Sequence, residues 1–512
     1  MLNEMSRTKK AIINAFFSIA SQLLSIVLSF VLRTAFIKIL GDQYTGVSTV
    51  FTTILAMLSL SELGFATAIA TALYKPLREK NNELICQLMS FYKKVYRLVA
   101  LTVFVIGMIL IPFLRYLVKD VPDIKENITV IYILYIFKTS ISYLMIYKTT
   151  ILNADQRIYV VKKLEMFCQV IRYLVEILAL IIFKEFFVYL CIEVIATVIQ
   201  NYILTKKAEN EYPNAFSLNA PPLPHDTVKS LLKDVKGLSM FKLSGTIGNS
   251  IDTMLISSFI NTATVTIVGN YTMIKDQVYK LLMQFFSAVI PSIGNLAAEG
   301  DANKQEKIFN RIFYISFLMV NFCASSLFVL FEPFMKIWLG EKYVLSNSIA
   351  FVIAFDFFLY ILLEAIASFR TANGLFVEGQ YRPVATALVN VILSIIFIQK
   401  FGVFGTILAT IIARFTTQWY DPYLLYKMVF KKKFKSFYLK YLCYVFLFIS
   451  GCMITKISYG VLKIENRIIS LIVGMVVCLI IPTTWVLLFT WFTDEFTYVK
   501  DMLKNFTRKA KE

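Results

Sequence analysis

Long apolar stretches recur along this 512-residue chain, and short polar segments separate them. A helix of about 20 apolar residues is long enough to cross the hydrocarbon core of a bilayer. The pattern therefore predicts an all-α polytopic membrane protein with fourteen transmembrane helices. No small-residue cleavage site follows the first stretch, so a retained helix is predicted there and not a signal peptide. The helices are expected at residues 11–37, 44–73, 95–117, 128–150, 164–183, 186–205, 237–260, 266–292, 311–331, 346–369, 383–399, 403–426, 441–458 and 468–491.

The longest polar interruption divides these helices into groups. We expect an N-terminal lobe of six helices at 1–205, a cytoplasmic linker at 206–236, a C-terminal lobe of six helices at 237–426, and two further helices with a cytoplasmic tail at 427–512. The end of the linker, SLLKDVKG, is predicted to be an interfacial helix that leads into the seventh span. Six helices on each side of a linker also suggest an internal repeat, as in transporters whose substrate site lies between repeats.

Composition and charge agree with a membrane protein. Hydrophobic residues make up 58% of the chain and charged residues only 17%, and the mean hydropathy is +0.68. The net charge of +19 is unevenly distributed: the tails and loops on one side carry roughly three times as many Lys and Arg residues as the loops on the other. This asymmetry predicts that both termini are cytoplasmic. The basic run KMVFKKKFKSFYLK is then a topology signal beside anionic lipid, and no nucleic-acid partner is expected.

The cysteine and histidine residues do not indicate a metal site or a catalytic site. None of the seven cysteines forms a Cys-x-x-Cys pair, and most lie within apolar segments, so they are predicted to be packing residues. The only histidine, His225, lies in the Pro-rich loop NAPPLPHDTVKS. We therefore expect no metal, no cofactor and no catalytic residue.

Charged residues inside the predicted spans are the candidate site residues. A charge at the centre of a bilayer costs about 2.5–3.5 kcal/mol or more, so these side chains must pair, reach the interface, or face a wet cavity. Arg172 with Glu176, and Asp276 with Lys280, are four residues apart and can pair within one helix. The candidates for substrate binding are Arg33, Lys138, Arg172, Lys242, Lys275 and Lys280, and the candidates for coupling or ion pairing are Glu62, Glu176, Asp252, Asp276, Asp356 and Glu364.

The positions of these charges separate structural from functional interpretations. Lys242 and Lys275 lie one to two turns inside a boundary, where a lysine can extend to the interface. Lys138 and Asp252 lie deep in their spans without a local partner. Charges on so many helices indicate a common polar interior, and a cavity with basic groups suits an anionic headgroup because Arg and Lys bind phosphate.

Five segments, in order, resemble polysaccharide repeat-unit flippases of the multidrug, oligosaccharidyl-lipid and polysaccharide exporter superfamily. They are FVLRTAFIKILGDQYTGVSTV, SLSELGFATAIATALYKPL, NSIDTMLISSFINTATVTIVGNYTMI, IPSIGNLAAEGDANKQEKIFNR and FEPFMKIWLGEKY. The resemblance covers most of residues 5–426, and within it Arg33 and Asp252 occupy matching positions of the family pattern. It implies two six-helix lobes around a central cavity, with residues 441–491 as an added helix pair.

The resemblance also implies a function. It is the movement of undecaprenyl-pyrophosphate-linked oligosaccharide repeat units from the inner to the outer leaflet of a bacterial cytoplasmic membrane, for capsule, O-antigen or exopolysaccharide assembly. The mechanism implied is alternating access, with H⁺ or Na⁺ as a coupling cation. A lipid II flippase, a teichoic acid flippase and a cation-coupled multidrug exporter remain alternatives of the same fold. A membrane glycosyltransferase or polymerase is a poorer alternative, because the predicted external loops are short.

Overall fold

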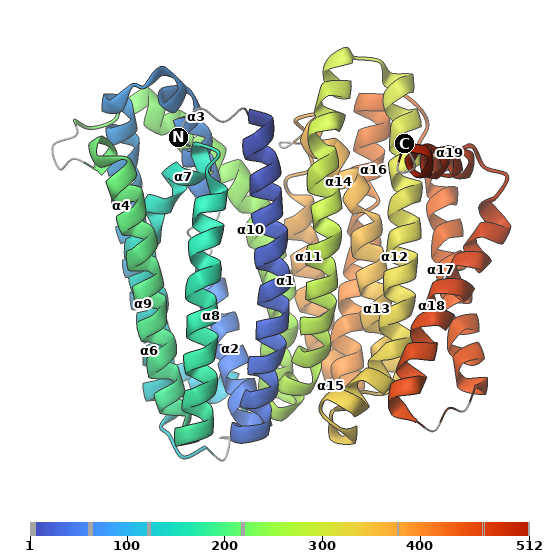
Figure 1. Cartoon of the computed structure of the whole chain (residues 1–512), viewed down its shortest axis with the longest axis horizontal. Helices are drawn as coiled ribbons and strands as arrows, with labels where there is room; N and C mark the ends of the chain where they lie inside the picture. Colours follow the sequence, from blue (N-terminus) through green and yellow to red (C-terminus); the bar gives the residue numbers. More distant parts are fainter. Residues whose placement is uncertain are drawn as a thin grey trace. The chain divides into compact units, whose positions relative to one another are not determined.

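The computed structural model describes residues 7–59, 65–119, 124–216, 221–375, 378–462, 464 and 466–509 (Figure 1). These residues form helices, turns and short connections, and no strand occurs among them. The chain divides into two compact units, Met1–Thr266 and Ile267–Glu512. The prediction of an all-helical fold is therefore confirmed, whereas the predicted division into lobes at 206–236 stays a prediction.

The first unit is a bundle of helices connected by short turns. Asparagine side chains cap two of its helices: Asn81 Oδ1 accepts from the backbone N–H of Leu84 at 3.0 Å, and Asn127 Oδ1 accepts from that of Thr129 at 2.8 Å. The helices are α1 (Arg7–Leu40), α2 (Asp42–Leu58), α3 (Phe65–Glu79), α4 (Asn82–Ile109), α5 (Leu114–Leu117), α6 (Ile128–Ile146), α7 (Thr150–Ala154), α8 (Ile158–Phe183), α9 (Phe186–Glu211) and α10 (His225–Phe259).

Packing in the first unit brings α1 against α8, α6 against α4 and α9, and α10 against α2. The α10 contact continues into the start of α11 (Thr262–Glu299) and is very close at Gly46 of α2. A β-carbon at Gly46 would lie 2.1 Å from the carbonyl oxygen of Thr262. Glycine at this position therefore allows the two backbones to touch.

The second unit contains most of α11 and all the later helices. Its hydrophobic core is rich in aromatic rings, and residues of α17 stack on those of two other helices. The ring centroids of Phe317 and Tyr444 are 4.0 Å apart, and those of Phe358 and Phe448 are 4.1 Å apart. The remaining helices are α12 (Ala302–Trp338), α13 (Asn347–Leu362), α14 (Glu364–Ala372), α15 (Arg382–Thr417), α16 (Tyr420–Leu425), α17 (Lys435–Val461), α18 (Arg467–Thr490) and α19 (Asp494–Lys509).

The element α15 consists of two antiparallel helices joined at Gly402. The backbone there has φ 56° and ψ −136°, outside the helical region. Residues on either side of the turn meet in register: Thr386 and Thr417 share a hydrogen bond of 2.6 Å, and Thr410 donates to Asn390 at 3.2 Å. Two helices therefore correspond to the predicted segments 383–399 and 403–426, and the second helix is interrupted after Thr417.

The helix pair α17 and α18 corresponds to the predicted added pair at 441–458 and 468–491. Both helices pack against each other and against α12. The aromatic stacks described above fix α17 to α12 and α13. Within the second unit, α17 is thus part of the aromatic core, and α18 packs against α12 and α17 at its edge.

Two details differ from the sequence-based expectations, and the number of spans stays open. The segment SLLKDVKG is not a separate interfacial helix, because α10 is continuous from His225 to Phe259. The predicted span 346–369 breaks at Leu363 into α13 and α14. Nine helical segments of the described residues are long and apolar enough to cross a membrane, or ten if the bent pair α4 and α5 is one span. The total of fourteen stays a prediction, since Arg382–Phe430 counts as one segment and since 60–64 and several side chains of α10 and α11 lie outside the described residues.

Candidate functional site

A cluster of four charged side chains lies within the first unit, on three different helices. Lys138 of α6 donates from Nζ to Oε1 of Glu193 on α9 at 2.9 Å. Arg172 and Glu176 face each other on α8, with Nε 3.5 Å from Oε1. Both pairs are close enough to influence each other electrostatically. We call these four residues the first-unit charge cluster.

The cluster lies near the middle of the membrane-spanning helices. Lys138 is ten residues from the start of α6, which at about 1.5 Å per residue is about 15 Å along the axis. Glu193 is seven residues from the start of α9 and Glu176 is seven from the end of α8, each about 10 Å from the helix end. A hydrocarbon core about 30 Å thick therefore surrounds the cluster on both sides.

Tyr135 contacts the Lys138 side chain, and Ser48 and Tyr189 lie on helices that pack against α6. The Lys138 ammonium lies 4.8 Å from the centre of the Tyr135 ring, a favourable cation–π arrangement. The Tyr135 hydroxyl shares a hydrogen bond of 2.6 Å with Ser48 of α2. Tyr189 is buried on α9, one turn before Glu193. The aromatic and hydroxyl groups thus link α2 to the helices that carry the charges.

Glu176 is the most deeply buried member of the cluster. Its side chain is 1% exposed, and neither of its carboxylate oxygens accepts a hydrogen bond from the residues that the structure describes. Burying an ionised carboxylate without hydrogen bonds is costly. The arrangement therefore favours a further hydrogen-bond donor at Glu176, beside Arg172.

The second unit contains an ion pair of the same kind. Arg414 of α15 donates through Nη1 to both the side-chain Oδ1 and the backbone carbonyl of Asp356 on α13, the latter at 3.1 Å. The Arg414 guanidinium also lies 4.6 Å from the centre of the Tyr360 ring. We call Asp356 and Arg414 the second-unit ion pair.

The two ion pairs occupy corresponding helices of the predicted repeat, with the charges exchanged. In the first unit the cation is on the fourth predicted span and the acid on the sixth, 55 residues later. In the second unit the acid is on the tenth and the cation on the twelfth, 58 residues later. Each cation also lies over a tyrosine of the earlier helix in its pair. This correspondence supports the internal repeat that the helix order suggests.

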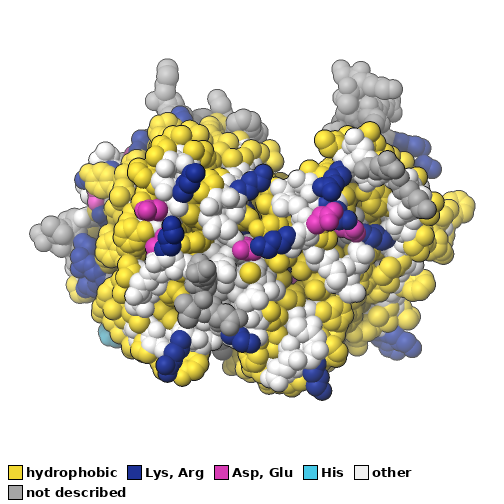
Figure 2. All heavy atoms as spheres, turned by 90° about the horizontal axis from the view of Figure 1, so that it is seen from below, with side chains coloured by type: hydrophobic (Ala, Val, Ile, Leu, Met, Phe, Trp, Pro, Cys, Tyr) yellow, Lys and Arg dark blue, Asp and Glu magenta, His cyan; other side chains and the backbone are white. Residues whose placement is uncertain are grey.

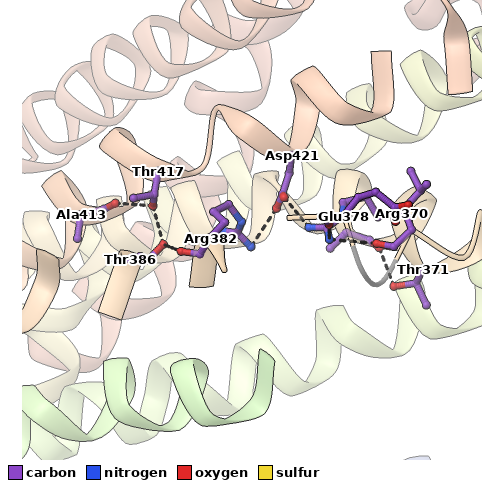
Figure 3. A network of polar contacts seen from close by, with 10 residues as sticks. Arg370, Thr371, Glu378, Arg382, Thr386, Ala413, Thr417 and Asp421 are labelled. Carbon is purple, nitrogen blue, oxygen red and sulfur yellow. Dashed lines mark hydrogen bonds and ion pairs between the residues drawn. The ribbon is translucent and has the colours of Figure 1, made fainter. Parts of the chain in front are cut away.

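A buried polar network lies at another level of the second unit, where α14, α15 and α16 meet (Figure 3). The Asp421 carboxylate accepts from Arg370 Nη1 and from Arg382 Nη2, the latter at 2.9 Å. Arg370 Nη2 also donates to the carbonyl oxygens of Leu375 and Glu378, at 3.1 and 2.9 Å. These contacts hold the segment between α14 and α15 against α16, which is a structural role.

Two polar contacts lie next to the last turn of α9 in the first unit. The Tyr212 hydroxyl donates to Asp155 Oδ2 at 2.6 Å, and Arg157 Nη1 lies 2.7 Å from Glu211 Oε2. Burial, together with the hydrogen bond to Asp155, raises the pKa of the Tyr212 phenol. The phenol is therefore neutral over the physiological range and acts as a donor.

The remaining sequence candidates are distributed over three helices. Arg33 is half-buried on α1, which packs against α8, and Asp252 is half-buried on α10. On α11, Asp276 pairs with the adjacent Lys275 at 3.8 Å and not with Lys280, although four-residue spacing would allow that pair.

Three further candidates have no described contact that assigns them a role. Glu364 is half-buried at the start of α14. Lys242 lies on α10, but its side chain, like all of Glu62, is outside the described residues. The structure thus brings together Lys138, Arg172 and Glu176 from the predicted set.

The charged residues within the spans can be located one by one from the sequence, whereas their partners on other helices cannot. Lys138 was noted as lacking a local partner, and its partner Glu193 is 55 residues away on another helix. Arg414 is likewise a cation within a predicted span, and its partner Asp356 is 58 residues away on another helix. The similar separations of the two pairs, 55 and 58 residues, are the signal that could have identified both. Asp421 has no such signal in the sequence.

Comparison with known proteins identifies the fold. No protein-family model matches the sequence, and no curated protein matches it. Among solved structures, the lipid II flippase MurJ in an inward closed conformation matches 93% of this chain and 98% of its own, with a TM-score of 0.65 and 13% identity.

Two multidrug transporters are also similar in structure. The Vibrio cholerae MATE transporter VcmN, in a mutant form, matches 83% of this chain and all of its own, with a TM-score of 0.58 and 14% identity. The MATE multidrug transporter DinF-BH matches 82% of this chain and 97% of its own, with a TM-score of 0.59 and 18% identity. The chain therefore has the fold shared by MurJ and the MATE transporters, that of a multi-pass membrane protein.

Proposed function

We propose that this protein is a flippase that moves an undecaprenyl-pyrophosphate-linked oligosaccharide repeat unit from the inner to the outer leaflet of the bacterial cytoplasmic membrane. The observation that carries the proposal is the first-unit charge cluster, Lys138, Arg172, Glu176 and Glu193, at mid-depth of the spanning helices. The fold shared with a lipid II flippase and the sequence resemblance to repeat-unit flippases support it.

The cluster suits an anionic cargo because its cations can change partners. At rest, Lys138 is paired with Glu193 and Arg172 with Glu176, so two cations balance two carboxylates. A pyrophosphate group offers several oxygens to Lys and Arg. When a cation of the cluster binds the pyrophosphate instead of its carboxylate, that carboxylate loses its partner. Because the site is poorly solvated, the unpaired carboxylate then binds a proton more readily. Cargo binding and proton binding are thus expected to favour each other.

A test uses the full chain in proteoliposomes with a fluorescent undecaprenyl-pyrophosphate saccharide, and measures the fraction of label protected from an external quencher. We expect the wild type to equilibrate the label between leaflets, and Lys138→Met to slow this at least about tenfold. The matched control is Lys163→Met, since Lys163 is an exposed lysine of α8 outside the cluster. Label that stays in one leaflet with the wild-type protein would contradict the proposal.

A cation-coupled multidrug exporter is the second candidate, favoured by the fold shared with VcmN and DinF-BH. The same vesicles distinguish the two when a lipophilic cationic dye replaces the saccharide. Accumulation of the dye under an imposed proton or sodium gradient, without movement of the saccharide, would assign the exporter function. The reverse result supports the flippase.

A further inference from the structure

A pocket of about 390 Å³ lies in the second unit between the ends of α12, α17 and α18. These ends are at the bottom of Figure 1, and Figure 2 views that side of the molecule, where basic and acidic side chains lie close together on a largely apolar or uncharged surface. Five charged residues line the pocket: Glu332, Lys336, Glu341, Lys456 and Arg467. We call it the α12–α17–α18 pocket.

The charges of the pocket do not balance. Glu332 accepts from both Lys336 and Lys456, each at 3.1 Å, and Arg467 lies 3.5 Å from Glu341. Among the lining residues that the structure describes, three cations thus face two carboxylates, which gives one net positive charge. A ligand group with a single negative charge, such as a phosphodiester, would neutralise the lining.

Hydroxyl groups and open space complete the lining. The hydroxyls of Tyr459 and Ser470 share one hydrogen bond of 2.6 Å, and since each carries one hydrogen, one of the pair can still donate to a ligand oxygen. Gly460 forms part of the wall, and a β-carbon there would meet nothing within 4 Å. The volume is in the range of small-molecule sites and can contain the polar head of a lipid.

Apolar residues that border the charged ones provide a surface for hydrocarbon chains. Ile457, Val461 and Ile468 each follow a lining residue directly in sequence, and they are 68%, 72% and 63% exposed. The helices that carry them have the length and composition of membrane spans. Charged groups at the ends of such helices lie at the depth of lipid phosphates, where Tyr and Trp are also favoured.

We propose that the α12–α17–α18 pocket binds the headgroup of an anionic phospholipid with one net negative charge, of the phosphatidylglycerol type. The phosphate contacts Lys456 and Arg467, and the acyl chains lie along Ile457, Val461 and Ile468. With both termini cytoplasmic, as the basic loops predict, this lipid belongs to the outer leaflet. The inference does not depend on the proposed function, because none of its residues belongs to the first-unit charge cluster or the second-unit ion pair.

The test is a titration of the purified full-length protein in detergent, with the apparent Tm as readout. Phosphatidylglycerol is expected to raise the Tm by several degrees, because a ligand that binds only the folded state stabilises it. Phosphatidylethanolamine and inorganic phosphate are expected to raise it much less at equal concentration. Native mass spectrometry of the same samples should retain one phosphatidylglycerol per chain.

Two variants at one position separate binding in the pocket from a general lipid effect. Gly460→Phe fills the open space without changing a charge and should weaken the phosphatidylglycerol effect at least about tenfold, whereas Gly460→Ala should preserve it. Lys456→Gln with Arg467→Gln should weaken binding similarly. The lipid-free Tm of each variant shows whether it is folded. An equal lipid-induced shift in Gly460→Phe and wild type, or equal shifts with phosphatidylethanolamine or inorganic phosphate, would overturn the proposal.

Discussion

The ion pair between Lys138 and Glu193 provides a quantitative test of the first-unit charge cluster. At 2.9 Å, the Coulomb attraction is about 6 kcal/mol for an effective dielectric constant of about 20. Desolvation of both groups offsets much of this gain, so replacing both partners with apolar residues costs little. Removing one partner alone is different, because it leaves a buried charge uncompensated, at a cost of about 3–5 kcal/mol.

The exposed fractions of the Lys138 and Glu193 side chains indicate where the loss of stability lies within the range of about 3–5 kcal/mol for removal of one partner. Lys138 is 16% and Glu193 19% exposed, so we expect about 3 kcal/mol for Glu193→Leu, which leaves the ammonium of Lys138 unpaired. For a unit of this size that corresponds to a decrease in Tm of roughly 5–10 °C. Lys138→Met should also lower the Tm, because it leaves the carboxylate of Glu193 without its partner.

The assay is thermal unfolding of the purified variants in detergent, with intrinsic fluorescence as the readout. The variants are Lys138→Met, Glu193→Leu, the double variant that combines them, and the exchanged pair Lys138→Glu with Glu193→Lys. The double apolar variant and the exchanged pair are expected within about 2 °C of wild type, and Lys163→Met serves as a surface control. Single variants as stable as wild type would refute the reasoning, as would a double variant whose loss equals the sum of the single losses.

Three further results are expected. Asp421→Asn should lower the Tm of the purified protein by the equivalent of about 3–5 kcal/mol, because two buried arginines lose their shared carboxylate; an unchanged Tm would contradict this. Gly46→Val should abolish a monodisperse size-exclusion peak, since its side chain would overlap the carbonyl of Thr262, and a normal peak would show that the backbones can separate. In a cysteine-free background, an impermeant maleimide added to intact cells should label single cysteines placed in 332–345 and not those in 206–236, and the opposite pattern would reverse the predicted orientation.

Sequence periodicity was sufficient for the helical fold but not for all of its boundaries. The spans at 383–399 and 403–426 could be separated because a short polar turn with Gly402 lies between them. The continuity of α10 from His225 to Phe259 could not be predicted, because a Pro-rich segment and a basic stretch suggest a boundary. The break of the helix at Leu363 likewise could not be predicted, because no glycine or proline lies there.

The candidate site shows a similar limit. Intramembrane charges could be found one by one, since each is a rare residue in an apolar run. Pairing within one helix could also be predicted, and Arg172 with Glu176 is such a case. Pairing between helices depends on which faces meet after folding, so the contact of Lys138 with Glu193 required a structure.

The exchange of charges between the two units has an electrical consequence. A conformational change that carries an elementary charge across a membrane is coupled to the potential by about 2.3 kcal/mol per 100 mV. Lys138 with Glu193, and Asp356 with Arg414, each move as a pair without net charge. Displacement of either intact pair through the field therefore depends little on voltage, whereas separation of Lys138 from Glu193, as the proposed function requires, would make the conformational change depend on voltage.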